Sequence, residues 1–260
     1  MNDFETMLLV TFIAGSVTGL GAIPILFRTT VSHRIYDAAI GLAAGVMVSA
    51  SVFGLLIPGT EEGALTSVLF GVFLGAAILL LGNYVIPHLH ARYTGWRAEG
   101  LRVDTDDEEL SRIRRILLIG GAIVLHNAPE GLAIGVAFAS GLEEVALLLA
   151  IVIGIQNIPD GFAFAVPLGE TDLSGLTVLL YTTLSGLLPQ LVAALFGFFL
   201  VAIATGIFPL AAGFAAGAML AVVFREMVPL SHGHGYADAA TIAFIIGFVI
   251  LLVLEELLVL

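Results

Sequence analysis

Charged residues are scarce in this chain of 260 residues, and that scarcity decides its class before any motif is considered. Asp, Glu, Lys and Arg make up 12% of the sequence, against about 25% in an ordinary soluble domain, while hydrophobic residues make up 59%. A water-soluble globule of this size could not cover its surface with so few charges. The composition therefore excludes a soluble enzyme, a nucleic-acid-binding protein and a disordered tail, and it predicts an integral membrane protein.

Two residue types are missing altogether. The chain has no cysteine, and all of its basic residues are arginine. Without cysteine there is no disulfide framework, no thiolate metal site and no thiol nucleophile. The first residues, MNDFE, are acidic and lack the positive region of a signal peptide, so we expect the first apolar segment to remain as a membrane helix.

Long apolar runs take the place of the missing charges. A transmembrane helix needs about 20 mostly apolar residues. Such runs occur at 7–27, 36–58, 65–87, 113–140, 143–168, 174–204, 207–229 and 237–259. The alternating polarity of β-barrel strands is absent. We therefore predict an all-α integral membrane protein in which eight transmembrane helices form one bundle, with residues 1–260 as a single transmembrane domain.

The distribution of arginine predicts the orientation of the chain. With eight spans, every arginine falls on one side of the membrane, and the loops on the opposite side carry Glu61, Glu62, Glu143 and Glu144 instead. Since positively charged loops stay in the cytoplasm, both termini are predicted to lie outside. The charged stretch 88–112 then becomes a cytoplasmic loop between the third and fourth spans. The predicted location is the cell (plasma) membrane, which the chain crosses many times.

Two matching polar motifs interrupt neighbouring spans at their centres. The span 113–140 contains HNAPEG at 126–131, and the span 143–168 contains QNIPDG at 156–161. In both, a nitrogen- or oxygen-bearing side chain is followed by Asn, any residue, Pro, an acid and Gly. Ionisable groups within a span are costly and usually functional. The two motifs therefore predict one functional site near the middle of the membrane.

The spacing within each motif suits metal binding. Helical residues three or four apart share a face, which places the polar side chains of each motif beside the acid of the same helix. Each proline frees the carbonyl four residues earlier, and free backbone at this depth is tolerated only where it meets protein, water or a ligand. Imidazole, carboxylate and amide groups suit zinc and its neighbours in the first transition row. The predicted ligands of a divalent metal are His126, Asn127, Glu130, Gln156, Asn157 and Asp160.

At these residues the sequence resembles the ZIP (Zrt/Irt-like) family of divalent-metal transporters, in its prokaryotic form. HNAPEG matches the family's fourth-helix signature, and QNIPDG looks like its prokaryotic fifth-helix motif. Residues 217–232, GAMLAVVFREMVPLSH, look like the seventh helix and the segment after it. The resemblance covers essentially the whole chain. It implies a carrier without a resident cofactor that moves a divalent metal into the cytoplasm, zinc first, with cadmium, iron, manganese and cobalt as alternatives.

The family's chemistry implies a binuclear site. The acids of the two motifs would serve both ions, His126 and Gln156 the first position, and the two asparagines the second. Met47 would lie beside the first position, as in some relatives. This chain departs from the family at Asp160, where the acid is usually Glu, and at Gln190, where an acid is often found. A neutral Gln190 would weaken or vacate the second metal position.

The resemblance also implies alternating access. The fourth and fifth spans, with parts of the first, sixth, seventh and eighth, would shift against a block that contains the second and third. Glu226, His232 and His234 are predicted as further metal ligands on the exit path, because they lie at or just past the cytoplasmic end of the seventh span. His88 and His90 flank the end of the third span on the same side.

Two other functions share the same ligands. One is a channel-like metal pore, and the other is an intramembrane metal-dependent hydrolase that would use a metal-activated water. The chain lacks the motifs H-E-x-x-H and G-x-S-x-G, so no enzyme is predicted.

Small residues four apart, such as Gly41 and Gly45, let membrane helices approach closely, within the bundle or in a homodimer. The predicted partners are the lipid bilayer and divalent metal ions, and no nucleic acid.

Overall fold

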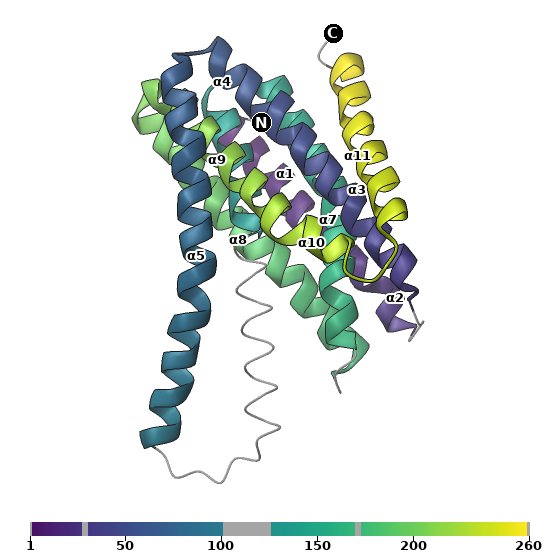
Figure 1. Ribbon diagram of the computed structural model, residues 1–260. Helices are drawn as coiled ribbons and strands as arrows, with labels where there is room; N and C mark the ends of the chain where they lie inside the picture. The colour runs from purple at the N-terminus through teal and green to yellow at the C-terminus, as the bar shows by residue number, and fades with distance from the viewer. Residues whose placement is uncertain (1, 28–30, 101–125, 170–172, 259–260) are drawn as a thin grey trace.

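A computed structural model describes residues 2–27, 31–100, 126–169 and 173–258 (Figure 1). In these residues the backbone forms helices and no strand, which confirms the all-α class. Helical stretches long and apolar enough to cross a membrane are Asp3–Leu26, His33–Glu61, Leu65–Gly82, Glu143–Gly169, Gly175–Ile203, Phe208–Ser231 and Ala237–Leu254. They match seven of the eight predicted spans, and residues 126–139 of the remaining span are helical as well.

Three spans are built from several consecutive helices. The first comprises α1 (Asp3–Val17), the 3-10 helix η1 (Thr18–Ala22) and α2 (Ile23–Leu26). The second comprises α3 (His33–Ser49), the π-helix η2 (Ala50–Leu56) and α4 (Ile57–Glu61). The seventh comprises α9 (Phe208–Val222), the π-helix η4 (Val223–Met227) and α10 (Val228–Ser231), after the 3-10 helix η3 (Thr205–Ile207). The remaining labelled helices are α5 (Leu65–Gly100), α7 (Glu143–Gly169), α8 (Gly175–Ile203) and α11 (Ala237–Leu258).

Local sequence explains where these helices begin. Asn2 and Glu5 form a capping box at the start of α1, and Ser32 and Ser174 cap α3 and α8 with their hydroxyl groups. The short helices α2, α4 and α10 each carry a proline in the first turn, where its missing N–H costs no hydrogen bond. The start of α1 and the end of α11 lie at the same end of the bundle, as an even number of spans requires (Figure 1).

The third span extends further than predicted. α5 stays helical as far as Gly100, so the first half of the predicted loop 88–112 is helix instead of loop. Leu, Ala, Arg and Glu in this stretch favour helix, and polar composition by itself does not end one. Residues 101–112 lie outside the described residues, and so do the side chains of His88 and His90.

Glycines allow two helix pairs to pack closely at opposite edges of the bundle. α5 packs along α9, and α11 packs along α3 (Figure 1). A Cβ atom at Gly45 would collide with the carbonyl oxygen of Phe244, and one at Gly75 with that of Phe214. The small-residue pairs of the sequence therefore serve packing within the chain. They carry no argument for a homodimer.

A second group of helices surrounds α7. α1, η1 and α8 pack against α7 and against one another, and α3 meets α7 at the boundary between the two groups. Residues 126–139 approach α8, since a Cβ atom at Gly131 would collide with the carbonyl oxygen of Gln190. The seventh span thus packs along the third, and the eighth packs along the second. Their glycines fit the backbones of those two helices.

Candidate metal centre

Both polar motifs lie where helices cross closely. The glycine that ends each motif faces a neighbouring backbone carbonyl, that of Gln190 for Gly131 and that of Thr18 for Gly161. A larger side chain at either glycine would push the motif away from its neighbour. The close crossings bring the backbones of neighbouring helices against both motifs. Four predicted ligands are buried, namely Asn127, Glu130, Gln156 and Asn157.

A short hydrogen bond joins the two motifs. Gln156 Nε2 donates to Glu130 Oε1 at 2.6 Å, and both side chains are 1% exposed. Glu130 Oε2 and Gln156 Oε1 are buried and have no hydrogen-bond partner within the described residues. The contact therefore places the first acid beside the second motif and leaves two acceptor oxygens without a donor.

Asn157 adds a third oxygen of this kind. Its Nδ2 donates to the carbonyl oxygen of Ala14 and to Gln190 Oε1, both at 2.9 Å. These two bonds fix the amide, while Asn157 Oδ1 stays buried without a partner among the residues described. Buried polar atoms are nearly always hydrogen-bonded. Three acceptors without a donor in two adjoining motifs are chemically suited to a cation.

Three of the predicted ligands line a cavity of about 280 Å³. His126, Asn127 and Asp160 form part of its wall, which also includes Tyr36 and Leu230. Glu130, Gln156 and Asn157 do not line it and form a buried group, whereas Asn127, although buried, belongs to the cavity group. Within the described part of the chain, no group of three or more His, Asp or Glu side chains is poised to hold a metal. Amide oxygens would therefore have to take part in binding.

Glu226 reaches the same cavity from the seventh span. Its Oε2 lies 3.4 Å from His126 Nδ1, and both side chains are about one-fifth exposed, at 23% and 20%. Glu226 belongs to the π-helical turn η4, and such turns occur frequently at functional sites. The predicted exit-path acid thus faces the first motif directly.

Gln190 and Met47 occupy different surroundings from those expected of metal ligands. Gln190 is fully buried, and its Oε1 accepts the hydrogen bond from Asn157, which leaves its Nε2 without a partner in the described structure. It offers a spare donor, not an acceptor. Met47 is fully buried in the apolar core and does not line the cavity.

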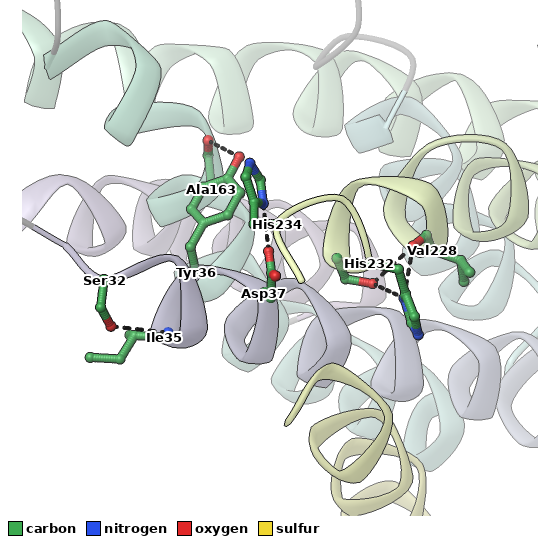
Figure 2. A network of polar contacts seen from close by, with 9 residues as sticks. Ser32, Ile35, Tyr36, Asp37, Ala163, Val228, His232 and His234 are labelled. Carbon is green, nitrogen blue, oxygen red and sulfur yellow. Dashed lines mark hydrogen bonds and ion pairs between the residues drawn. The ribbon is translucent and has the colours of Figure 1, made fainter. Parts of the chain in front are cut away.

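The two predicted exit histidines belong to separate networks, as Figure 2 shows. His232 Nδ1 lies 3.0 Å from the carbonyl oxygen of Val228, and its Nε2 lies 3.3 Å from Thr241 Oγ1. His234 Nδ1 instead lies 2.7 Å from Asp37 Oδ1. The structure therefore does not bring His232 and His234 together.

Asp37 is a polar residue that the sequence analysis missed. It lies in the predicted span 36–58, is 0% exposed, and its Oδ2 has no partner among the described residues. The signal that could have found it was its position inside an apolar run, next to Tyr36. Its partner His234 lies almost 200 residues later, at a separation of 197, which local pattern does not connect.

An all-helical bundle with several membrane-spanning segments, and with polar side chains buried at its centre beside a cavity, is typical of a membrane transporter. Residues 98–255 match the family described as ZIP zinc transporter. That match is more than half of the chain, and it includes both polar motifs.

Individual relatives agree along nearly the whole chain. It is 35% identical over 257 residues to the zinc transporter GufA of Myxococcus xanthus, covering 95% of this chain and 97% of that protein. It is 36% identical over 259 residues to the zinc transporter ZIPB of Bordetella bronchiseptica, covering 92% and 77%. It is 33% identical over 329 residues to the zinc transporter ZIP11 of Homo sapiens, covering 95% and 96%. The chain belongs to the ZIP zinc transporter family, which confirms the resemblance and the prediction of a membrane transporter instead of an enzyme.

Proposed function

We propose that this chain moves divalent transition-metal ions, zinc first, across the plasma membrane through a site formed by residues 126–130 and α7. The observation that carries the proposal is a set of buried oxygens with no donor among the described residues, namely Glu130 Oε2, Gln156 Oε1 and Asn157 Oδ1. A buried acceptor without a partner costs free energy, and a bound cation removes that cost. The relatives described above are all called zinc transporters, which supports zinc as the ion.

The proposed ligands act in two groups. His126, Asn127 and Asp160 line the cavity, so they hold an ion where water can reach it. Glu130, Gln156 and Asn157 are buried, so they take an ion that has lost its water. Two groups of donors leave room for a second ion, but they divide the ligands differently from the binuclear site that the family implies, in which His126 and Gln156 share one position. One chain supplies every ligand, so the proposal needs no homodimer.

The proposed direction is into the cytoplasm. The cavity wall includes Tyr36, Pro167 and Leu230, which lie at the ends of α3, α7 and α10 next to the connections 27–33, 169–175 and 231–237. With both termini outside, as the arginine distribution favours, these connections are cytoplasmic, and so is the segment 88–112. An ion released from the cavity wall then enters the cytoplasm.

Metal uptake into proteoliposomes tests the site. Zinc, cadmium, iron, manganese and cobalt are compared in wild type and in Glu130→Gln, which keeps the shape of the side chain and removes its charge. We expect zinc flux to fall by about tenfold or more, the factor that about 1.4 kcal/mol of lost binding produces. Glu62→Gln, the same change at an exposed residue, is the matched control and should keep wild-type flux. Wild-type zinc flux in Glu130→Gln would show that Glu130 is not part of the transport site.

The same vesicles separate a carrier from a channel-like pore. A carrier saturates at low zinc and exchanges faster when zinc is present on both sides, because its site must reorient in each cycle. A pore conducts in proportion to the zinc gradient and shows no such exchange. We expect saturation and accelerated exchange, since the buried ligands are closed in by the helix crossings at Gly131 and Gly161.

A further inference from the structure

A second proline in α7 frees a backbone carbonyl beside the cavity. Pro167 lies inside α7, eight residues after Pro159, and it has no N–H to donate to the carbonyl oxygen of Ala163. Ala163 and Pro167 both line the cavity. Since free backbone at membrane depth needs a partner, something other than α7 itself must satisfy this carbonyl.

The partner comes from another helix. The Tyr36 hydroxyl, in the first turn of α3, donates to the carbonyl oxygen of Ala163 at 3.3 Å (Figure 2). It stands in for the N–H that Pro167 lacks. Tyr36 lines the cavity too, so the hydrogen bond joins α3 to α7 at the cavity wall. Ala163 follows Asp160 by three residues on the same helical face.

The Tyr36 ring is held in place by its neighbours. His234 meets it edge-on, with ring centroids 5.5 Å apart, and Phe162 lies 6.2 Å away. His234 is itself fixed by Asp37 at 2.7 Å and stacks on His33 at 4.6 Å. Tyr36 itself is 7% exposed, so we expect its hydroxyl group to be held firmly in place.

We propose that Tyr36 is a positioning residue that holds α7 against α3 in the state with the cytoplasmic cavity, and that it releases α7 when the site reorients. A bond within a helix breaks only when the helix unwinds, whereas a single hydrogen bond between two helices has a modest net strength and can be broken in every cycle. The proline therefore converts a fixed bond of α7 into an exchangeable contact with α3. The proposal rests on the proposed function in that the reorienting helix carries the ion.

Thiol labelling tests this contact without measuring transport. The chain has no cysteine, so Ser185→Cys places one thiol in the cavity wall. The metal-free protein, in vesicles, is treated with a membrane-impermeant methanethiosulfonate from the side of the 27–33 connection. The labelling rate, relative to that of the denatured chain, gives the ratio of accessible to closed molecules. We expect Tyr36→Phe, which removes only the hydroxyl, to lower this ratio by about fivefold, as one hydrogen bond of ordinary net strength allows.

The decisive experiment repeats Tyr36→Phe in a chain that also carries Pro167→Ala. Alanine restores the N–H that bonds to the Ala163 carbonyl, so Tyr36→Phe should then change the ratio little. Tyr181→Phe, the same change on an exposed ring of α8, is the matched control and should leave the ratio unchanged. The proposal would be overturned if Tyr36→Phe changed the ratio equally with and without Pro167. It would also be overturned if Tyr36→Phe changed the ratio no more than Tyr181→Phe does. Wild-type flux in Glu130→Gln would instead overturn the proposed function and leave the labelling result intact.

Discussion

Replacing Gln190 with glutamate tests how many ions the buried centre holds. Gln190 is fully buried, its Oε1 accepts from Asn157 Nδ2 at 2.9 Å, and its Nε2 has no partner among the described residues. Glutamate has the same shape, so Gln190→Glu keeps the acceptor and exchanges the spare donor for an oxygen. The variant adds one negative charge and one more acceptor to the oxygens of Glu130, Gln156 and Asn157.

Without metal, the variant is expected to lose stability. Asn157 would donate to a charged group, and such a bond contributes about 1.5–3 kcal/mol instead of about 0.5–1.5 kcal/mol. Burying the carboxylate costs several kcal/mol, so the metal-free variant loses about 1–4 kcal/mol unless it takes up a proton. A divalent cation at the new oxygen offsets most of this cost. Zinc binding should therefore tighten by about tenfold or more, since about 1.4 kcal/mol is a factor of ten.

Two measurements check this expectation. Equilibrium dialysis gives the number of zinc ions bound per chain, and melting of chelator-treated protein with and without zinc gives the rise in Tm. We expect Gln190→Glu to bind one more zinc than wild type and to show a larger rise in Tm. Gln190→Leu removes the amide without adding charge and should bind no more zinc than wild type. An unchanged zinc count in Gln190→Glu would refute the argument that a neutral Gln190 keeps the second position weak.

Two further predictions concern the surroundings of the centre. Gly131→Ala forces a Cβ atom against the Gln190 carbonyl oxygen, so we expect the free energy of unfolding to fall by about 1–3 kcal/mol, with a lower Tm in detergent. Gly206→Ala, which meets none of the described residues within 4 Å, should melt like wild type. A normal Tm for Gly131→Ala would mean that the crossing adapts easily. Gln156→Leu removes the donor to Glu130 Oε1, so zinc affinity measured by titration should fall by about tenfold or more. Unchanged affinity would show that Gln156 neither binds the ion nor orients Glu130.

The membrane spans were predictable because the length and apolar composition of a segment are enough to identify a transmembrane helix. A bilayer demands about 20 apolar residues per helix, and this rule holds whatever the neighbouring helices are. The continuation of α5 as far as Gly100 was not predictable in this way, because polar residues that leave the membrane can continue a helix. The pairing of helices also needed the structure. Gly45 and Gly75 predict that another backbone comes close, but they do not identify which helix it belongs to.

The candidate site was predictable only as far as it lies within single helices. Spacing placed Gln156 and Asn157 near the acid of their own motif, but the observed bonds run between helices, from Gln156 to Glu130 and from Asn157 to Gln190. Proline spacing showed which carbonyls are freed and not which group satisfies them. Asp37 was missed for the same reason, because its partner His234 lies in a distant turn of the chain.

The two departures from the family's usual residues have unequal consequences because their surroundings differ. Asp160 is half-buried on the wall of the cavity, where a water molecule can complete the coordination of an ion that a shorter side chain fails to reach. Gln190 is fully buried and already bonded to Asn157, so no water can replace the charge that it lacks. Under the proposed function, we therefore expect the shorter side chain of Asp160 to change only how an ion is held. Under the proposed function, we expect the missing charge at Gln190 to decide whether a second ion is held.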